Sequence, residues 1–349
     1  MAENIEDLIL PDIPKELAQQ FNLIEQKFVR AEVDQIRNGV TRFRPILKER
    51  DEAIANSALK DSFWTQVFAN APPDVDEYVL ESDAAVLGIA LKSLSVERFE
   101  VDDQGNGEPR SFRLTLEFRP EDNESFENEK LVKEFYWRKQ ITRSPSGAKR
   151  SWEGLVSEPV RINWKEGQDL TKGLLDAACD LAEAEKKNKG DRKELPEFKK
   201  LQSKIEEAAE ATNDEGKDAD DDDFSLGALS PAGTSFFSLF GYRGRSVTAE
   251  ESKAATKEDD ERFQKLVKGE QVEEDDEEED EDDDEDTDEA IEIFPDGDEL
   301  AIALAEDLYT HAFKYFGGAA DDDASELMDG EDDESEDEGE ERPRKKTKV

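Results

Sequence analysis

The sequence predicts an α+β fold: a long N-terminal helix, then an antiparallel sheet covered by helices, with disordered acidic segments. Three observations carry this prediction. Apolar residues recur every four and three positions from Leu17 to Ala31, apolar and polar residues alternate from Ser111 to Phe118, and Ala, Glu, Lys and Leu dominate from Thr171 to Ala211. These patterns are typical of a helix seam, a half-buried strand and helices, respectively.

The first helix is expected to start at Asp12 or Ile13, with Pro14 in its first turn, and to run toward Arg44 before Pro45. The 31 residues from Pro14 to Arg44 would span about 45 Å, more than the width of a small domain. We predict that its apolar stripe joins two copies of the chain as in a coiled coil, and a surface helix packed on its own domain is the alternative. The predicted interface residues are Leu17, Phe21, Ile24, Phe28, Ala31 and Gln35.

The central part of the chain is expected to form the sheet. Ile46 to Ala58 should be a short helix, and Gln104 to Pro109 and Ser144 to Lys149 have the composition of hairpin loops. The β-rich or alternating stretches that predict strands are 87–101, 111–118, 131–141 and 160–164.

The remaining elements follow from breakers and apolar residues. Gly190 and Pro196 should divide the helical stretch that begins at Thr171. Phe236 and its aromatic neighbours should return the chain to the core, and the polar stretch 247–269 is expected to be a mobile connection. A last helix, with Leu300, Leu304, Leu308 and Phe313 on its apolar side, is expected from Ile293 to Phe316.

Negative charge dominates the composition. The 93 acidic and 46 basic residues give a net charge of −47, which favours cationic partners and argues against nucleic-acid binding through a general basic surface. Glu273 to Glu289 holds 16 acidic residues in 17 positions, and Asp321 to Glu341 holds 14 more. Removing these 30 charges leaves −17, so the folded body should itself be acidic.

Other features argue for a binding protein and against an enzyme. The single cysteine, Cys179, provides no disulfide framework or Cys-rich zinc site and favours a reducing, intracellular location. The acidic N-terminus does not have the pattern of a signal peptide, and no apolar run is long enough to cross a membrane. His311 has no recognisable nucleophile or metal partner, and no phosphate-binding GxxxxGK[ST] motif occurs. We therefore expect no cofactor.

Several segments, taken in order, resemble one family. They are RFRPILKERDEAI, DSFWTQVFANAP, FRLTLEFRPEDNESFENEKLVKEFYW, INWKEGQDLT, SFFSLFGYRG and IEIFPDGDELA, followed by an acidic C-terminus. From Pro14 to Phe316 the chain resembles the nucleosome assembly protein and SET family of histone chaperones. The resemblance implies a dimer joined by antiparallel long helices. Each end would carry an earmuff-shaped domain whose acidic concave underside receives core histones.

This organisation can be assigned to ranges of the sequence. We expect a flexible N-terminus at 1–13, the long dimerisation helix with a following short helix at 14–58, an earmuff domain at 59–316 and an acidic tail at 317–349. Within the earmuff domain, a helical insert is expected at about 174–212 and a disordered acidic insert at about 247–290.

Histone-binding residues are predicted on two grounds. In the INWKEGQDLT segment, Asp169 and Thr171 are contact candidates by resemblance, and capping of a loop is the alternative role. In the acidic insert, we predict that the carboxylates screen histone charge, whereas a solubilising spacer is the alternative. An extended run carries one charge per ~3.6 Å, whereas duplex DNA carries one per ~1.7 Å. The run should therefore release the histone when nucleosomal contacts with DNA become available. The predicted insert contacts include Glu273, Asp276, Asp282 and Asp286.

The basic C-terminal end has the composition of a nuclear localisation signal, formed by Arg344, Lys345, Lys346 and Lys348; folding back on the acidic tail is the alternative. The predicted function is ATP-independent binding and delivery of core histones in the nucleus, with shuttling to the cytoplasm possible in principle. The alternative function is a regulatory subunit that presents substrates to a histone acetyltransferase or inhibits a phosphatase. Neither a membrane nor a specific nucleic-acid sequence is an expected partner.

Overall fold

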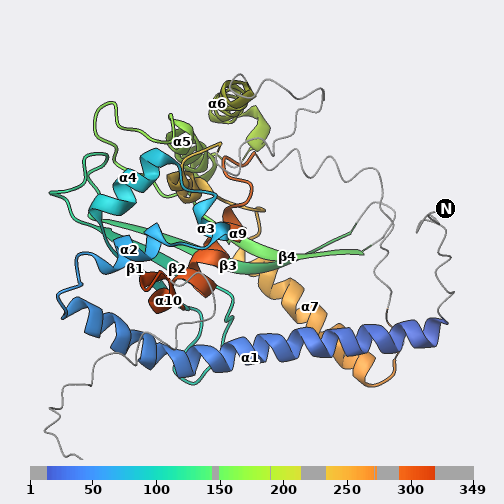
Figure 1. The fold of residues 1–349 in the computed structure, drawn as a ribbon. Helices are drawn as coiled ribbons and strands as arrows, with labels where there is room; N and C mark the ends of the chain where they lie inside the picture. Colours follow the sequence, from blue (N-terminus) through green and yellow to red (C-terminus); the bar gives the residue numbers. More distant parts are fainter. Residues whose placement is uncertain are drawn as a thin grey trace, which may run out of the picture.

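The structure, a computed structural model, describes residues 14–143, 149–188, 190–213, 233–270, 272 and 291–318. A four-stranded antiparallel sheet forms its centre, with helices packed around it and a long helix running past one side (Figure 1). The strands follow the order of the sequence: β1 (Leu91–Glu97), β2 (Phe112–Phe118), β3 (Lys130–Arg143) and β4 (Lys149–Ser157). The predicted α+β class is confirmed.

The sequence predicted that the long helix would end before Pro45, but α1 (Lys15–Ala55) continues through this proline to Ala55. Proline removes one backbone donor, yet Pro45 is exposed, so water can reach the carbonyl that loses its partner. Tertiary contacts on both sides hold the helix together. Arg44 donates to the carbonyl of Val101 at 2.8 Å, and Arg50 donates to the carbonyl of Tyr309. The short helix expected after Pro45 is therefore the last part of α1.

The central strands lie where alternation placed them. Phe112 pairs with Phe135 across β2 and β3, and their rings stack 5.1 Å apart on the buried side of the sheet. The strand expected from Leu87 begins later, because Glu81–Ala90 forms the helix α4 and the strand starts at Leu91. A continuous apolar run does not distinguish a buried helix from a strand, which explains this error.

The outer edge of the sheet differs from the prediction. The expected strand at 160–164 is wrong, since Trp164 makes only an isolated bridge with Phe126. The fourth strand is instead β4, which follows the predicted hairpin loop and pairs with β3 from Ser157 back to Lys149. Both strands project well beyond β1 and β2 (Figure 1). We call the part from Arg138 to Trp152 the hairpin arm.

One helical layer covers the sheet. It contains α5 (Leu174–Lys187) and α6 (Pro196–Asn213), separated near Gly190 and Pro196 as predicted. Cys179 lies on the buried face of α5. The 3₁₀ helix η4 (Phe236–Gly241) brings a fully buried aromatic cluster beside this layer, so the predicted return of the chain to the core is confirmed.

The chain after Ile293 does not form one continuous helix. It is divided into α9 (Gly297–Ile302), a π-helical turn η6 (Ala303–Leu308) and α10 (Ala312–Phe316). The amide of Tyr309 donates to the carbonyl of Leu304, five residues earlier, which is the bond of a π turn. This extra residue turns α10 onto α2 (Phe63–Ala69), where the rings of Phe63 and Phe316 stack 4.8 Å apart.

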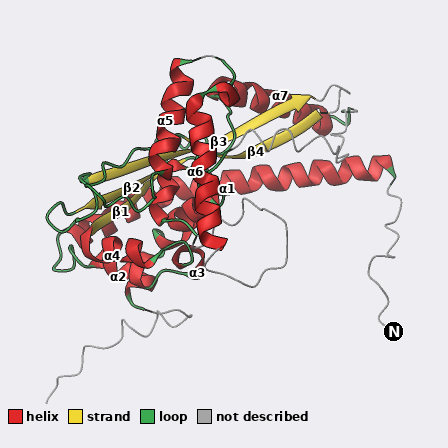
Figure 2. Cartoon of the chain, turned by 90° about the horizontal axis from the view of Figure 1, so that it is seen from above, coloured by secondary structure: helices red, strands yellow, loops and turns green. Residues whose placement is uncertain are grey.

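The stretch 247–269, expected to be mobile, is largely helical, so this part of the predicted disordered insert is wrong. It forms α7 (Ala249–Val267), which contacts both α1 and β3 and lies between them in Figure 1. Figure 2 shows it beside the projecting ends of β3 and β4. Thr248 and Glu251 cap its N-terminus reciprocally, with the hydroxyl of Thr248 accepting from the amide of Glu251. Polar residues form a helix here because their partners lie on other elements. The rest of the insert, residues 273–290, lies outside the described residues.

Two buried polar anchors hold η4 in place. The carboxylate of Asp83 in α4 accepts from the hydroxyl of Ser235 at 2.6 Å and from the amide of Phe236 at 2.7 Å. The ammonium of Lys133 in β3 donates to three carbonyls around the other end of η4, those of Glu158, Phe240 and Tyr242. Burial raises the pKa of Asp83 and lowers the pKa of Lys133 to about 7.

Candidate functional site

The predicted interface stripe lies on the exposed face of α1. Leu17, Phe21, Ile24 and Phe28 are 38%, 52%, 49% and 63% exposed, and Ala31 and Gln35 are also exposed. Four large apolar side chains in a row along one helix face are costly to leave in water. Within the described residues, this face is therefore available to a partner.

The opposite face of α1 packs on the chain's own body. Arg30 donates to Asp259 at 2.8 Å and to Asp260 at 2.7 Å, and its guanidinium lies 4.3 Å from the centre of the Phe263 ring, all in α7. Two turns further along α1, Arg37 donates to the carbonyl of Gly107 at 3.0 Å. The face of α1 that binds its own domain is thus not the face that carries the apolar stripe.

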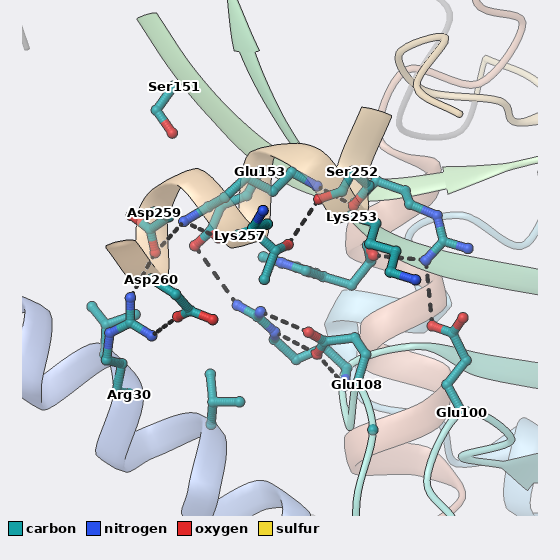
Figure 3. A pocket seen from close by; sticks show the side chains of 18 of the residues that line it. Arg30, Glu100, Glu108, Ser151, Glu153, Ser252, Lys253, Lys257, Asp259 and Asp260 are labelled. Atoms are coloured by element: carbon teal, nitrogen blue, oxygen red, sulfur yellow. Dashed lines mark hydrogen bonds and ion pairs between the residues drawn. The ribbon is translucent and has the colours of Figure 1, made fainter. Parts of the chain in front are cut away.

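A cleft of about 1070 Å³ lies where α1, α7, the loop between β1 and β2, and the hairpin arm meet (Figure 3). Its charged side chains pair with one another across the cleft. Lys139 of β3 lies 3.2 Å from Asp259 and 3.6 Å from Glu153, and Arg138 lies 3.4 Å from Glu100. Positive and negative side chains line the cleft and largely neutralise each other. The cleft is therefore a joint, held by ion pairs, between α1 and the body.

Trp137 is one of the residues that line this cleft. Its ring is 4.2 Å from the guanidinium of Arg110, which in turn lies 2.8 Å from the carboxylate of Glu108. The indole Nε1 of Trp137 is buried, and the described residues offer it no hydrogen-bond acceptor. The cleft therefore combines an aromatic surface with paired charges.

The segment that carries Asp169 and Thr171 forms a tight loop before α5. The carboxylate of Asp169 accepts from the amide of Thr171 at 2.8 Å, from its hydroxyl at 2.7 Å and from the amide of Gly173 at 2.7 Å. Thr171 is buried, and Gly173 has a φ of +83°, a conformation that glycine adopts without strain. These contacts are those of the loop-capping alternative, and direct histone contact by either residue stays a prediction.

The other predicted site residues lie outside the described residues. This holds for Glu273, Asp276, Asp282 and Asp286 in the acidic insert, and for Arg344, Lys345, Lys346 and Lys348 at the C-terminal end. Their roles stay predictions.

Chemistry of other kinds has little support in the described ranges. His311 is exposed and pairs at 2.9 Å with Asp307, one helical turn earlier. No group of three or more His, Cys, Asp or Glu side chains in these ranges could hold a metal ion. None of the described helices combines the length and the apolar character needed to cross a membrane.

Sequence reasoning missed α7 and its contacts with Arg30 and Lys139. One signal was present, because Thr248 followed three residues later by Glu251 is the pattern of a capping box. The partners of α7 lie more than a hundred residues away in the chain, where periodicity has no information about them.

The chain matches the family model described as nucleosome assembly protein (NAP) over residues 25–319. It is 30% identical over 158 residues to a Schizosaccharomyces pombe protein named for nucleosome assembly, covering 44% of this chain and 61% of that one. It is also 30% identical over 132 residues to Protein SET of Drosophila melanogaster, covering 38% of this chain and 42% of that one. The matched regions thus span about three fifths and two fifths of these relatives' lengths.

Two solved structures are similar at lower identity. Ccp1 is 21% identical with a TM-score of 0.47, covering 88% of this chain and 97% of that one. The Vps75 histone chaperone is 18% identical with a TM-score of 0.42, covering 85% and 95%. The match to the family model extends from the first third of α1 to the end of the described residues, and by it the chain belongs to the nucleosome assembly protein family.

Proposed function

We propose that this protein is a histone chaperone: a homodimer that binds core histones through acidic surfaces and delivers them during nucleosome assembly, without catalysis. The observation that carries the proposal is an acidic chain, of net charge −47, built on a long helix whose apolar face its own body leaves exposed. Membership of the nucleosome assembly protein family supports the same function.

The dimer would form through the exposed stripe of α1. Leu17, Phe21, Ile24 and Phe28 recur at heptad spacing, which is the pattern that seats side chains of one helix between those of another. The inner face is already occupied by contacts such as that of Arg30 with Asp259. Pairing of two copies would thus bury the stripe without disturbing the body.

Histone binding would use two kinds of negative charge. The rest of the chain has a net charge of −17 once both acidic runs are removed, and the runs contribute the other 30. Fixed charges on a folded surface select a partner by geometry, whereas extended runs attract it over a distance of about a Debye length, ~8 Å at physiological salt. Asp169 remains the contact candidate on the body, and Thr171, which is buried, would act by holding the Asp169 loop.

The test is a fluorescence titration of each core-histone pair with the purified full chain at 0.15 and 0.5 M salt. A variant in which the acidic residues of 273–289 and 321–341 are replaced by Gly and Ser provides the comparison. We expect tight binding by the full chain and weaker binding by the variant, which retains its circular dichroism spectrum. No binding of any pair by the full chain at 0.15 M salt would reject the proposed function. Equal affinity of both proteins at each salt concentration would limit binding to the body.

Nuclear localisation is part of the proposal and rests on the cluster of Arg344, Lys345, Lys346 and Lys348. A fluorescent fusion in which the four basic residues are replaced by Ala should accumulate less in the nucleus than the unaltered fusion. Equal nuclear accumulation would reject the role of this cluster.

A further inference from the structure

The helix α7 packs on the body with few apolar contacts. Of its 19 residues, only three are buried. The helix also has stabilising contacts of its own, because Thr248 and Glu251 cap its first turn and Lys257 pairs with Glu261 at 3.8 Å. Docking of α7 on the body therefore depends on contacts between charged and polar groups.

On one side, α7 pairs with α1. Among the described side chains of α1, Arg30 is the first along the helix to pair with another element, and both of its partners, Asp259 and Asp260, lie in α7. Further along, α1 is held by bonds to backbone carbonyls, beginning with that of Arg37 to Gly107. The N-terminal part of α1, which carries the apolar stripe, is therefore attached to the body through α7.

On the other side, α7 pairs with the hairpin arm. Glu258 lies 3.0 Å from Arg143 and 3.2 Å from Lys149, and Asp259 lies 3.2 Å from Lys139. Figures 1 and 2 both show α7 beside the projecting ends of β3 and β4. The helix α7 is thus a strap, meaning an element that connects the N-terminal part of α1 to the hairpin arm.

Several ion pairs of this strap are open to solvent. The side chains of Glu258, Arg143 and Asp260 are 41%, 59% and 57% exposed. Exposed ion pairs are weak, and the screening length falls from ~10 Å at 0.1 M salt to ~3 Å at 1 M. The core of the body is instead held by buried rings such as those of Phe112 and Phe135, which salt does not screen. Salt should therefore weaken the strap before it affects the core.

One backbone amide reports whether α7 is docked. The amide of Lys139 in β3 donates to the hydroxyl of Ser252 in α7 at 3.0 Å. Two residues earlier, the amide of Trp137 donates in the same manner to the hydroxyl of Ser111, which lies outside α7, at 2.9 Å. Detachment of α7 would expose the first amide to exchange with water and leave the second protected.

We propose that α7 detaches as a unit from α1 and the hairpin arm when a polycation competes for the carboxylates of Glu258, Asp259 and Asp260, and that it is docked in the free protein. Detachment releases the N-terminal part of α1, so that the strap sets the angle between the long helix and the body. As regulation of the proposed function, on which this step rests, a strongly basic client releases the strap itself, and the two bodies of a dimer then adjust to the client.

Residue-resolved amide hydrogen exchange of the full chain tests the strap without a histone. Exchange is measured at 0.05 and 0.5 M salt, and at 0.05 M salt with poly-L-lysine. We expect the amide of Lys139 to exchange at least about tenfold faster at 0.5 M salt, and likewise with poly-L-lysine. The amide of Trp137 should keep its rate, which also controls for any effect of salt on exchange itself.

A pair of variants separates the strap from net charge. Arg30→Gln/Arg143→Gln removes one cation from each side of the strap, and the amide of Lys139 should then exchange fast already at 0.05 M salt. Lys186→Gln/Lys187→Gln on α5 removes the same charge and two other exposed ion pairs, and should behave as the parent. Small-angle X-ray scattering should show a broader distribution of distances in the first variant only.

Equal exchange of the Lys139 amide at both salt concentrations would overturn the proposal. Equal acceleration at Trp137 would also overturn it, because the arm would then open as a whole. A saturating core-histone pair should accelerate the Lys139 amide as poly-L-lysine does, and a bound pair that leaves it protected would overturn release by the client. Absence of histone binding would reject the proposed function, whereas the salt and poly-L-lysine results decide on the strap alone.

Discussion

Arg30 in α1 and Asp259 in α7 lie 2.8 Å apart, although 229 positions separate them in the chain. The pair connects the long helix to α7, a helix in which only Ser252, Ala255 and Leu266 are buried. Ion pairs and the contact of Arg30 with Phe263, more than apolar burial, thus hold α7 against α1.

Replacing Arg30 should loosen α7 without unfolding the body. Because both side chains are partly exposed, we expect Arg30→Met to cost only about 0.5–1 kcal/mol, seen as faster amide exchange in α7. Lys48→Met, which removes an exposed ion pair with Glu52 on the same helix, is the control and should leave α7 unchanged. Equal exchange in the Arg30 variant and the parent would show that the pair contributes nothing.

The exposed stripe should respond to a single charge. Phe28→Asp places a carboxylate at the most exposed apolar position of the stripe, and desolvating it in a helix pair is costly. We expect a shift from dimer to monomer at micromolar protein in light scattering, with unchanged secondary structure. Ile89→Asp in α4 alters a side chain of similar exposure off the stripe and should keep the mass of the parent. A dimer in both variants would reject the stripe as the interface.

Asp83 should be among the most sensitive polar residues of the body. Asp83→Ala removes the acceptor from the hydroxyl of Ser235 and the amide of Phe236, and leaves both donors buried. We expect a loss of about 3 kcal/mol in the free energy of unfolding, measured with urea. Asp122→Ala, at an exposed ion pair with Arg119, should cost less than about 1 kcal/mol. Similar losses for both variants would contradict this role of Asp83.

Lys133 should make stability rise with pH in a narrow window. Its pKa is about 7 in the folded protein because of burial, against about 10.4 in an unfolded chain. Between pH 7.5 and 8.5 the unfolded state therefore holds a proton that the folded state has lost, and raising the pH favours folding. The expected gain across this window is on the order of 1 kcal/mol in urea unfolding.

The parent protein and the Lys133→Met control both carry Cys179→Ala, because the thiol has a pKa of about 8.5 in an unfolded chain and about 11 in the folded protein, and its ionisation would offset the rise. The tyrosines ionise above this window in the unfolded chain. The rise should be absent in Lys133→Met, whatever that variant loses in overall stability. An equal rise in both proteins would assign it to another group.

The sequence predicted the positions of those elements whose residues follow a local pattern. Alternation around Leu114 placed β2 and β3, and the breakers Gly190 and Pro196 placed the ends of α5 and α6. The prediction was wrong for elements whose ends depend on contacts with residues far away in the chain. Pro45 stays in a helix because Arg44 and Arg50 hold the chain on both sides of it. The strand β4 has no clear alternation, and its position follows from pairing with β3.

The same distinction between local patterns and long-range contacts applies to the candidate site. Heptad spacing alone identified the stripe from Leu17 to Phe28, and those side chains are exposed. For Asp169 the sequence left two roles open, and its three hydrogen bonds are those of loop capping. The joint formed by α1, α7 and the hairpin arm depends on pairs such as Lys139 with Asp259, which lie 120 positions apart and have no pattern along the chain.

The position of Cys179 on the inner face of α5 limits the reaction of its thiol with oxidants. It is the only cysteine of the chain, and burial raises the pKa of its thiol to about 11. Peroxides and disulfides react with the thiolate, which this side chain does not form at neutral pH. In the folded protein this thiol is therefore a poor target for oxidants.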